Sequence, residues 1–389
     1  MRARIHHLLT AVVTVAALAT AVAGCRPPGS GGPGAPGGPG DGAGAQVRLN
    51  EIQVLASHNS YHVEPEPVLL DALKAFLGEP ANGLEYTHRP LAEQFDAGVR
   101  QIELDVFADD PAGGRYAAPK LAPVFGLAPV DPALSTPGLK VIHVQEVDYR
   151  STCPTLVDCL TQVRDWSDAH PGHVPITIQV EAKDGTIPDP GFGFVTPLPW
   201  TGDTFRELEA EIATVFTPDR VLTPAEVRGD AASLNEAVRS RGWPRLDQAR
   251  GQVMFVLDDS GAKRDAYRAE LPDLDDRTVF VDVPETDPDA AVMVVNDPIG
   301  SADRIRSLVE DGFIVRTRAD ADTVQARTGD TTRRDAAFAS GAHYVSTDYV
   351  WPDDRFGTGY VVDLPGDDPA RCNPVSALPS CERAADLGG

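Results

Sequence analysis

The sequence predicts an α/β fold, a TIM-type (β/α)8 barrel, regular or distorted, in a single catalytic domain of residues 49–389. Eight short apolar runs are nearly continuous, as expected of parallel strands covered on both faces. They occupy residues 54–62, 100–109, 139–146, 175–184, 251–259, 290–297, 312–320 and 342–349. Segments with helical patterning separate several of the runs, an alternation typical of parallel α/β folds. Eight strands favour a closed barrel over an open sheet.

One further apolar run, residues 278–283, could displace one of the eight. A glycine or a proline lies at or just after the end of each expected helix, where such residues stop helices. These helices occupy residues 91–98, 156–170, 205–216, 301–311 and 319–340. Two stretches rich in proline and glycine, residues 110–138 and 185–201, follow the second and fourth runs. On a barrel they would be long loops on the catalytic face.

The N-terminal residues are predicted to lie outside the barrel. Arg2 and Arg4 precede an apolar stretch, so residues 1–24 have the pattern of an export signal. The stretch ends in Val-Ala-Gly-Cys, which resembles the lipobox of bacterial lipoproteins, where Cys25 would carry lipid; an ordinary secretory signal is the alternative. Residues 25–48, rich in glycine and proline, indicate a tether. We expect an exported protein, anchored through Cys25 or secreted.

The other four cysteines form two local pairs, Cys153 with Cys159 and Cys372 with Cys381. In an exported protein such pairs predict disulfides, and neither spacing is that of structural zinc ligands. The formal net charge is −24. It argues against nucleic acid as a partner and against broad attraction to anionic membranes. Any membrane contact should therefore be local.

Polar residues capable of catalysis lie at the ends of several runs. Because residues two apart in a strand share a face, such pairs should point to the same side of the barrel. The pairs are Glu103 with Asp105, His143 with Gln145, Glu181 with Lys183, and Arg316 with Arg318. Charged groups at strand ends are costly in a core unless they meet a metal, an anion or each other. Convergence on one metal and one phosphate is the simplest interpretation.

The candidate metal ligands offer only oxygen atoms: Asn59, Glu103, Asp105 and Glu181. This set suits a hard cation such as Ca²⁺, whereas zinc or iron would recruit imidazoles. His58 and His143, on the first and third runs, suit general acid–base chemistry near neutral pH. The histidines at positions 62, 88, 170 and 173 lie in loop or helix-end contexts and are interpreted as structural. Lys183, Arg316 and Arg318 could bind a phosphate.

Four segments carry a resemblance to a known family: ASHNSYH, PLAEQFDAGVRQIELDVF, KVIHV and VEAKD. In this order, from about residue 51 to 184, they resemble the calcium-dependent phosphatidylinositol-specific phospholipase C family in a bacterial form. The resemblance implies His58 as general base, His143 as the second catalytic histidine, and the four oxygen-bearing residues as calcium ligands. It implies cleavage of phosphatidylinositol or a related phospholipid at a membrane surface, by a protein expected to be a monomer. The products would be diacylglycerol and a cyclic inositol phosphate, released or opened by water.

Two alternatives remain open at this point. A glycerophosphodiester phosphodiesterase shares the barrel and the Glu-x-Asp strand, but that family opens with a His-Arg-Gly type motif where this chain has Ser57-His58-Asn59. The other alternative is a lipid-tethered binding protein on a degenerate barrel. If the substrate must carry a hydroxyl next to its phosphate, the glycerophosphodiester phosphodiesterase is excluded. A measured turnover would exclude the binding protein. The long loop after the second run departs from the family pattern and leaves the headgroup undetermined.

Overall fold

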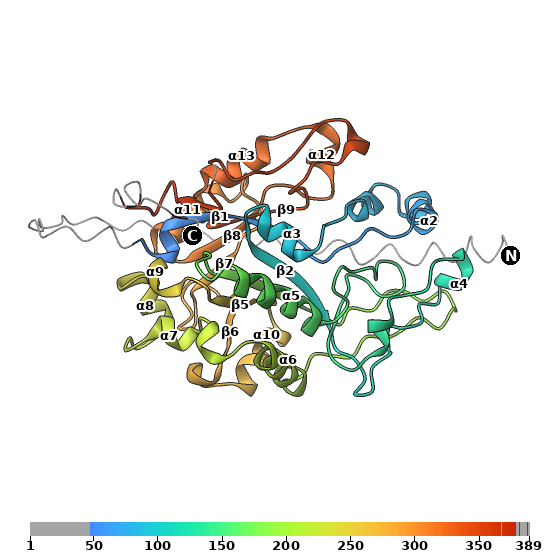
Figure 1. The fold of residues 1–389 in the computed structure, drawn as a ribbon, viewed down its shortest axis with the longest axis horizontal. Coiled ribbons are helices and arrows are strands. Elements are labelled where there is room, and N and C mark those ends of the chain that lie inside the picture. Colours follow the sequence, from blue (N-terminus) through green and yellow to red (C-terminus); the bar gives the residue numbers. More distant parts are fainter. Residues whose placement is uncertain (1–46, 367, 379–380, 382–386, 388–389) are drawn as a thin grey trace, which may run out of the picture.

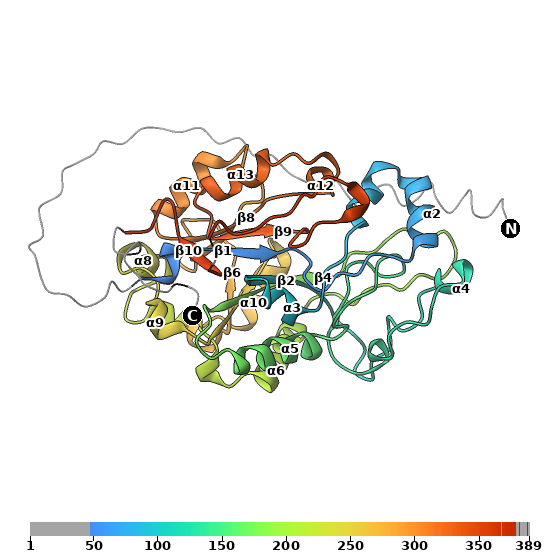
Figure 2. The same cartoon turned by 45° about the horizontal axis from the view of Figure 1, so that its top comes forward.

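Eight parallel strands form a barrel in this chain (Figures 1 and 2). The computed structural model describes residues 47–366, 368–378, 381 and 387. The predicted export signal, Cys25 and nearly all of the predicted tether therefore lie outside the described residues. Among the residues described, no helix is long and apolar enough to cross a membrane.

The barrel strands follow the spatial order β6-β5-β4-β2-β1-β9-β8-β7, and every neighbouring pair in this order is parallel. The strands are β1 (Ile52–Ser57), β2 (Val99–Phe107), β4 (Ile176–Lys183), β5 (Val253–Leu257), β6 (Val279–Val281), β7 (Val292–Val294), β8 (Ile314–Arg318) and β9 (Tyr344–Thr347). A single parallel bridge between Asp282 and Val292 joins β6 to β7. The predicted barrel is thus confirmed, with a weak closure between its two end strands.

The third predicted strand, residues 139–146, is wrong as a barrel strand. Only β3 (Lys140–Val141) forms there, and it pairs antiparallel with the end of β2 at Val106 and Phe107. The reason is that β1 pairs with β2 only as far as Gln101, which leaves the same edge of β2 free beyond the end of β1. β3 covers that free edge, and β6 from the additional run takes the eighth place in the barrel.

Helices lie between most strands along the chain. They are α2 (Pro67–Leu77), α3 (Leu91–Asp96), α4 (Ala122–Phe125), α5 (Leu156–Ala169), α6 (Gly202–Val215), α7 (Pro224–Arg228), α8 (Leu234–Ser240), α9 (Leu246–Ala249), α10 (Ala262–Glu270), α11 (Ala302–Glu310), α12 (Val324–Thr328) and α13 (Thr332–Ala339). Short 3-10 helices occupy Leu49–Glu51, Glu79–Leu84, Pro132–Ser135, Pro218–Arg220, Leu274–Asp276 and Asp354–Phe356. Four predicted helices correspond to α3, α5, α6 and α11. The predicted helix 319–340 is instead divided into α12 and α13, because the chain turns at Gly329 with φ of 71°.

Local sequence accounts for the packing of α5 against the barrel. Its N-cap is Thr155, whose side chain accepts a hydrogen bond from the Asp158 backbone N–H. The helix buries Leu156, Leu160 and Val163 on one side, at helical spacing, in the same core as the strand residues. Apolar burial of this kind contributes about 25 cal/mol per Å² and is the main stabilising term of the fold.

Both predicted disulfides are present. Cys153 bonds Cys159, which links the loop before α5 to its first turns, and Cys372 bonds Cys381. Cys372 ends β10 (Ala370–Cys372), which pairs antiparallel with β1 and carries the C-terminal segment across the barrel.

The segment after β1 and the long loops after β2 and β4 build a lobe at one end of the molecule. Figures 1 and 2 show α2 and α4 together at that end, opposite α8 and α9. A small hydrophobic cluster ties the lobe together: Leu69, Leu73, Ala81 and Leu121, with Leu77, Leu84, Phe125, Leu127, Val147, Phe192 and Phe194 against it. The lobe adjoins the C-terminal ends of β2 and β4, the edge where barrels of this kind carry their chemistry.

Glu211 on α6 gives a prediction about stability. Burial raises the pKa of its carboxyl group to about 7, although one oxygen accepts a hydrogen bond from Leu139 N at 2.8 Å. The other oxygen has no partner among the described residues. Because the folded-state pKa is raised, its stabilising contribution is present below the ordinary value of 4.5 and is lost as pH rises through about 7.

We expect Glu211→Gln, which cannot ionise, to raise the thermal unfolding midpoint by a few degrees at pH 8 and by less at pH 5. Calorimetry at the two pH values measures the difference. Glu310→Gln, at an exposed position on α11, is the control and should change neither midpoint. An equal shift of the Glu211 variant at both pH values would contradict the prediction.

Candidate active site

Three carboxylates meet at the C-terminal ends of β2 and β4. Glu103 and Asp105 lie on β2, and Glu181 lies on β4 directly beside Asp105 in the parallel register. One oxygen of each lies within 4.8 Å of the others. Glu103 and Asp105 are almost fully buried, at 3% and 1% exposure. The strand-end pattern of the sequence therefore predicted a real cluster.

Asp105 is the least satisfied member of this cluster. Neither of its oxygens accepts a hydrogen bond from a described residue, and Oδ2 has only an ion pair with Lys183 Nζ, 3.2 Å away. Burial raises the pKa of Asp105 well above its usual value, although Lys183 opposes the shift. A buried carboxylate without donors is costly and calls for a cation. With oxygen donors only, the cluster fits a hard divalent ion such as Ca²⁺.

Asn59 stands in the sharp turn that follows β1. Its φ is 43°, in the left-handed region that asparagine tolerates better than most residues. The next residue, Ser60, donates its backbone N–H to the Glu103 carbonyl at 2.9 Å, which holds the turn against β2. The Asn59 amide donates to Tyr86 Oη at 3.1 Å and so leaves its carbonyl oxygen as an acceptor. This carbonyl oxygen is the atom that Asn59 would offer as a fourth oxygen ligand.

His58 lies where the ends of β1, β8 and β9 converge. Its Nδ1 is 2.7 Å from Asp348 Oδ1, and Arg318 donates to Asp348 Oδ2 at 2.8 Å and to His58 Nε2 at 3.1 Å. Burial and the charge of Arg318 lower the pKa of His58, against the opposing effects of Asp348 and Glu103. Arg318 can only donate, so Nε2 accepts its hydrogen bond and the imidazole is neutral in this arrangement. Its Nδ1–H donates to Asp348, which leaves the lone pair on Nε2.

His143 lies in the loop after β3, not at the end of a barrel strand as the sequence suggested. Its Nδ1 donates to Asp148 Oδ2 at 2.6 Å, and its side chain is 23% exposed. The charge of Glu103 acts to raise the pKa of His58, and the charge of His143 acts to lower the pKa of Glu181. Each imidazole is thus within electrostatic range of a different carboxylate of the cluster.

The structure separates the three basic residues that the sequence grouped as phosphate ligands. Arg316 is 1% exposed, and its guanidinium group donates hydrogen bonds to Glu103, to Asn296 and to Ser346 Oγ at 3.1 Å. Arg318 and Lys183 lie nearer the surface, with 14% and 22% of their side chains exposed. Arg316 therefore lies beneath the carboxylates, while the other two lie where a bound molecule could reach them.

Sequence reasoning missed three residues of this site. Asp348 follows the last strand, and the strand-end rule that found the other residues would have found it. Asp148 lies in a loop without any local signal. His62 was interpreted as structural, yet its Nε2 contacts Asp148 at 2.9 Å and its ring lies 5.7 Å from that of His143.

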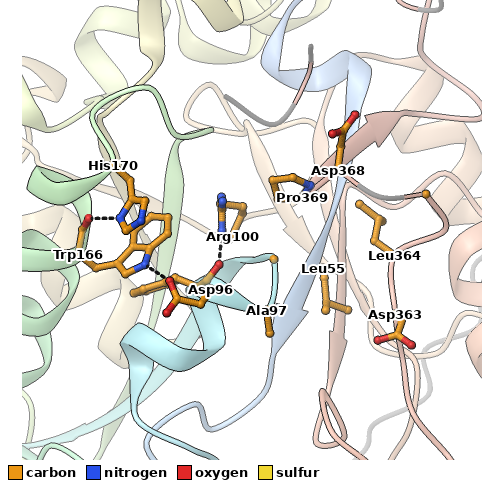
Figure 3. Close-up of a pocket in the computed structure, with 13 residues that line it drawn as sticks. Leu55, Asp96, Ala97, Arg100, Trp166, His170, Asp363, Leu364, Asp368 and Pro369 are labelled. Carbon is orange, nitrogen blue, oxygen red and sulfur yellow. Dashed lines mark hydrogen bonds between the residues drawn. The ribbon is translucent and has the colours of Figure 1, made fainter.

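A cavity of about 690 Å³ lies elsewhere, between α3, α5 and the C-terminal segment (Figure 3). Trp166 stacks on His170 there and donates to Asp96 at 2.8 Å. None of the candidate catalytic, metal-binding or phosphate-binding residues lines this cavity. The candidate site is therefore identified by the chemistry of the residues at the strand ends and not by the volume of a cavity.

A family model described as phosphoinositide phospholipase C, Ca²⁺-dependent, matches residues 47–374. The chain belongs to this family. It is a calcium-dependent phosphoinositide phospholipase C, which confirms the enzyme class and the cofactor expected from the sequence. A search of curated protein sequences found no match.

Solved structures agree with the fold of this phospholipase. A calcium-dependent phosphoinositol-specific phospholipase C from a Pseudomonas species is 19% identical over 85% of this chain and 97% of its own, with a TM-score of 0.51. A Ca²⁺-dependent phosphatidylinositol-specific phospholipase C from Streptomyces antibioticus is 17% identical over 84% of this chain and 99% of its own, with a TM-score of 0.52. At these identities the likeness shows the barrel fold.

Proposed function

We propose that the enzyme cleaves phosphatidylinositol, or a closely related lipid, to diacylglycerol and a cyclic inositol phosphate. The inositol hydroxyl next to the phosphate would be the nucleophile, since it is already adjacent to phosphorus and needs only to be oriented and deprotonated. The observation that supports this best is the His58 imidazole, oriented by Asp348, with its Nε2 facing Arg318 and within electrostatic range of the oxygen-only carboxylate cluster.

Asn59, Glu103, Asp105 and Glu181 would hold the calcium ion. When bound, calcium supplies positive charge to the phosphate oxygens and lowers the pKa of the attacking hydroxyl. Arg316 would keep the Glu103 carboxylate in place from below, since it contacts that carboxylate and no exposed surface.

His58 would take the proton of the attacking hydroxyl on Nε2. Asp348 accepts the Nδ1–H bond, which fixes this tautomer and would stabilise the imidazolium that forms. Arg318 must release Nε2 when the substrate enters. The phosphate is then the natural acceptor for its guanidinium group.

His143 would donate from Nε2 to the phosphoryl oxygens while its Nδ1–H remains bonded to Asp148. Lys183 would add positive charge at the same place. Burial would lower the pKa of Lys183, but Asp105 and Glu181 outweigh it and raise that pKa, so the ammonium stays charged.

The substrate is a lipid, so we propose that the lobe beside the site contacts the membrane locally. Half-buried aromatic side chains at positions 125, 192 and 194 lie on the loops that follow β2 and β4. A net charge of −24 disfavours any broader attraction to anionic lipid.

Phosphorus NMR of the full chain with phospholipid vesicles tests the proposal. With calcium, phosphatidylinositol should give a cyclic phosphodiester, whereas an analogue methylated on the hydroxyl next to the phosphate should not react. Phosphatidylcholine, which lacks such a hydroxyl, is the second control. Cleavage of the methylated analogue at the rate of phosphatidylinositol would exclude attack by that hydroxyl.

A further inference from the structure

Asp148 is held by two imidazoles. Its side chain is fully buried, and its carboxylate receives His62 Nε2 at 3.0 and 2.9 Å and His143 Nδ1 at 2.6 Å. Burial would raise the pKa of Asp148, but the charge of His62 and the hydrogen bonds from both rings outweigh it and lower that pKa. Asp148 is therefore an ionised carboxylate that bridges the two histidines.

His62 faces an acceptor on each side of its ring. Nε2 faces the Asp148 carboxylate, and Nδ1 lies 3.1 Å from the Tyr86 carbonyl oxygen. A carbonyl oxygen and an ionised carboxylate can only accept, so each ring nitrogen of His62 can act there only as a donor. The ring also stacks on Tyr86, with centroids 4.2 Å apart. His62 is thus held on both sides of its ring, with Nε2 directed at the Asp148 carboxylate.

The backbone anchors His62 to the first barrel strand. Its N–H donates to the Asn59 carbonyl at 2.8 Å, and its own carbonyl accepts from His88 N at 2.9 Å. Asp148, by contrast, lies in a loop, held to Val144 by two backbone hydrogen bonds of 2.8 and 2.9 Å. The loop is also bonded to the segment after β1 through its backbone, by Thr152 N to Tyr61 O at 2.8 Å. His62 adds the side-chain contact that holds the Asp148 carboxylate itself.

We propose that His62 is a positioning residue for the reaction: through Asp148 it fixes the orientation of the His143 ring, whose Nδ1–H is bonded to that carboxylate. This inference rests on the proposed role of His143. The segment after β1 then supplies three parts of the site at once, the base at His58, a calcium ligand at Asn59 and the support of the second histidine at His62. At metal sites, groups that orient a ligand through a hydrogen bond are commonly worth about 10–100-fold in activity, and we expect an effect of the same order here.

Two substitutions of His62 separate a hydrogen-bonding role from simple packing. Glutamine can still donate to Asp148, whereas leucine cannot. We expect His62→Gln to lower kcat by about 10-fold and His62→Leu by about 100-fold, with KM unchanged, because His62 does not reach the substrate. Calcium affinity, measured by titration calorimetry, should stay at the wild-type value in both variants.

A double-mutant cycle tests the route through Asp148. If His62 acts only by holding Asp148, then His62→Gln with Asp148→Asn should be no slower than Asp148→Asn alone. His343→Gln is the matched control. His343 is also a buried histidine bonded to the backbone, but its Nδ1 accepts from Val315 N at 3.1 Å and its Nε2 contacts Asn50 O, away from the site. This control should leave kcat unchanged.

Nitrogen NMR of selectively labelled histidines reports on the hydrogen bonds of His62 and His143 without an activity assay. His62 Nε2 should be protonated at the assay pH, and His62→Gln should shift the His143 signals while His343→Gln does not. An unprotonated His62 Nε2, additive effects in the cycle, or wild-type kcat in His62→Leu would overturn the inference. Full activity of His143→Ala would instead overturn the proposed role of His143, and the NMR result would still decide the hydrogen-bond arrangement.

Discussion

Asp105→Asn and Glu103→Gln should abolish tight calcium binding and lower turnover by roughly 1,000-fold or more, since each removes a negative charge and a ligand oxygen from the candidate metal site. Chelation of the wild-type enzyme should abolish activity reversibly. Calorimetric titration with calcium and assays with and without chelator measure both effects. Glu181→Gln should act in the same direction, with a smaller loss because Glu181 is more exposed.

The two main variants should differ in stability. Asp105 accepts no hydrogen bond from a described residue, and burial raises its pKa, so its charge destabilises the calcium-free fold. Asp105→Asn should therefore raise the unfolding midpoint in chelator and lose the further rise that calcium gives the wild type. Glu103→Gln should lower the midpoint, because Arg316 would keep its charge in a buried place without its partner.

Asp109→Asn is the matched control for a buried carboxylate on the same segment. Asp109 is paired with Lys140 at 2.9 Å and accepts backbone hydrogen bonds, for example from Arg115 N at 3.0 Å. It should lose stability and keep calcium affinity. Full activity of the wild type in chelator, or unchanged calcium affinity in Asp105→Asn, would show that the ligand assignment is wrong.

The sequence predicted the barrel and the carboxylate cluster because both depend on a local rule. Alternation along a strand assigns each side chain to a face, and the catalytic edge of a parallel barrel collects the strand ends. Glu103, Asp105 and Glu181 needed nothing more than this rule. The same rule places Asp348 at the edge.

The sequence could not predict how deep in the barrel a side chain lies, or where a loop places its residues. Arg316 and Arg318 share a face, but two residues of a strand span about 6.6 Å, so one arginine lies beneath the carboxylates and the other beside His58. His143 and Asp148 meet through a turn in which Glu146 has a φ of 70°. No periodicity in the run 139–146 distinguishes that turn from a strand, because its residues are as apolar as those of a true barrel strand.

His58→Ala and His143→Ala should each lower turnover by about 100-fold or more while calcium affinity stays at the wild-type value. The ring nitrogens of His58 contact Asp348 and Arg318, and His143 Nδ1 contacts Asp148, so neither imidazole belongs to the oxygen cluster. Loss of calcium binding in either histidine variant would contradict the separation of roles and would favour a metal that recruits imidazoles.

Asp348→Asn tests why His58 can act as a base. The carboxylate accepts from both His58 Nδ1 and Arg318, whereas an asparagine of the same shape offers one acceptor and one donor group. If the amide donates to Nδ1, the proton of the neutral ring moves to Nε2 and the lone pair is lost where the hydroxyl must give up its proton. If instead the amide oxygen accepts from Nδ1, the amide NH2 group faces Arg318. Two donors then face each other, and the contact with Arg318 is lost. Either way, kcat should fall nearly as far as in His58→Ala, and calcium binding should stay intact. Wild-type kcat in Asp348→Asn would exclude the His58–Asp348 pair as the general base.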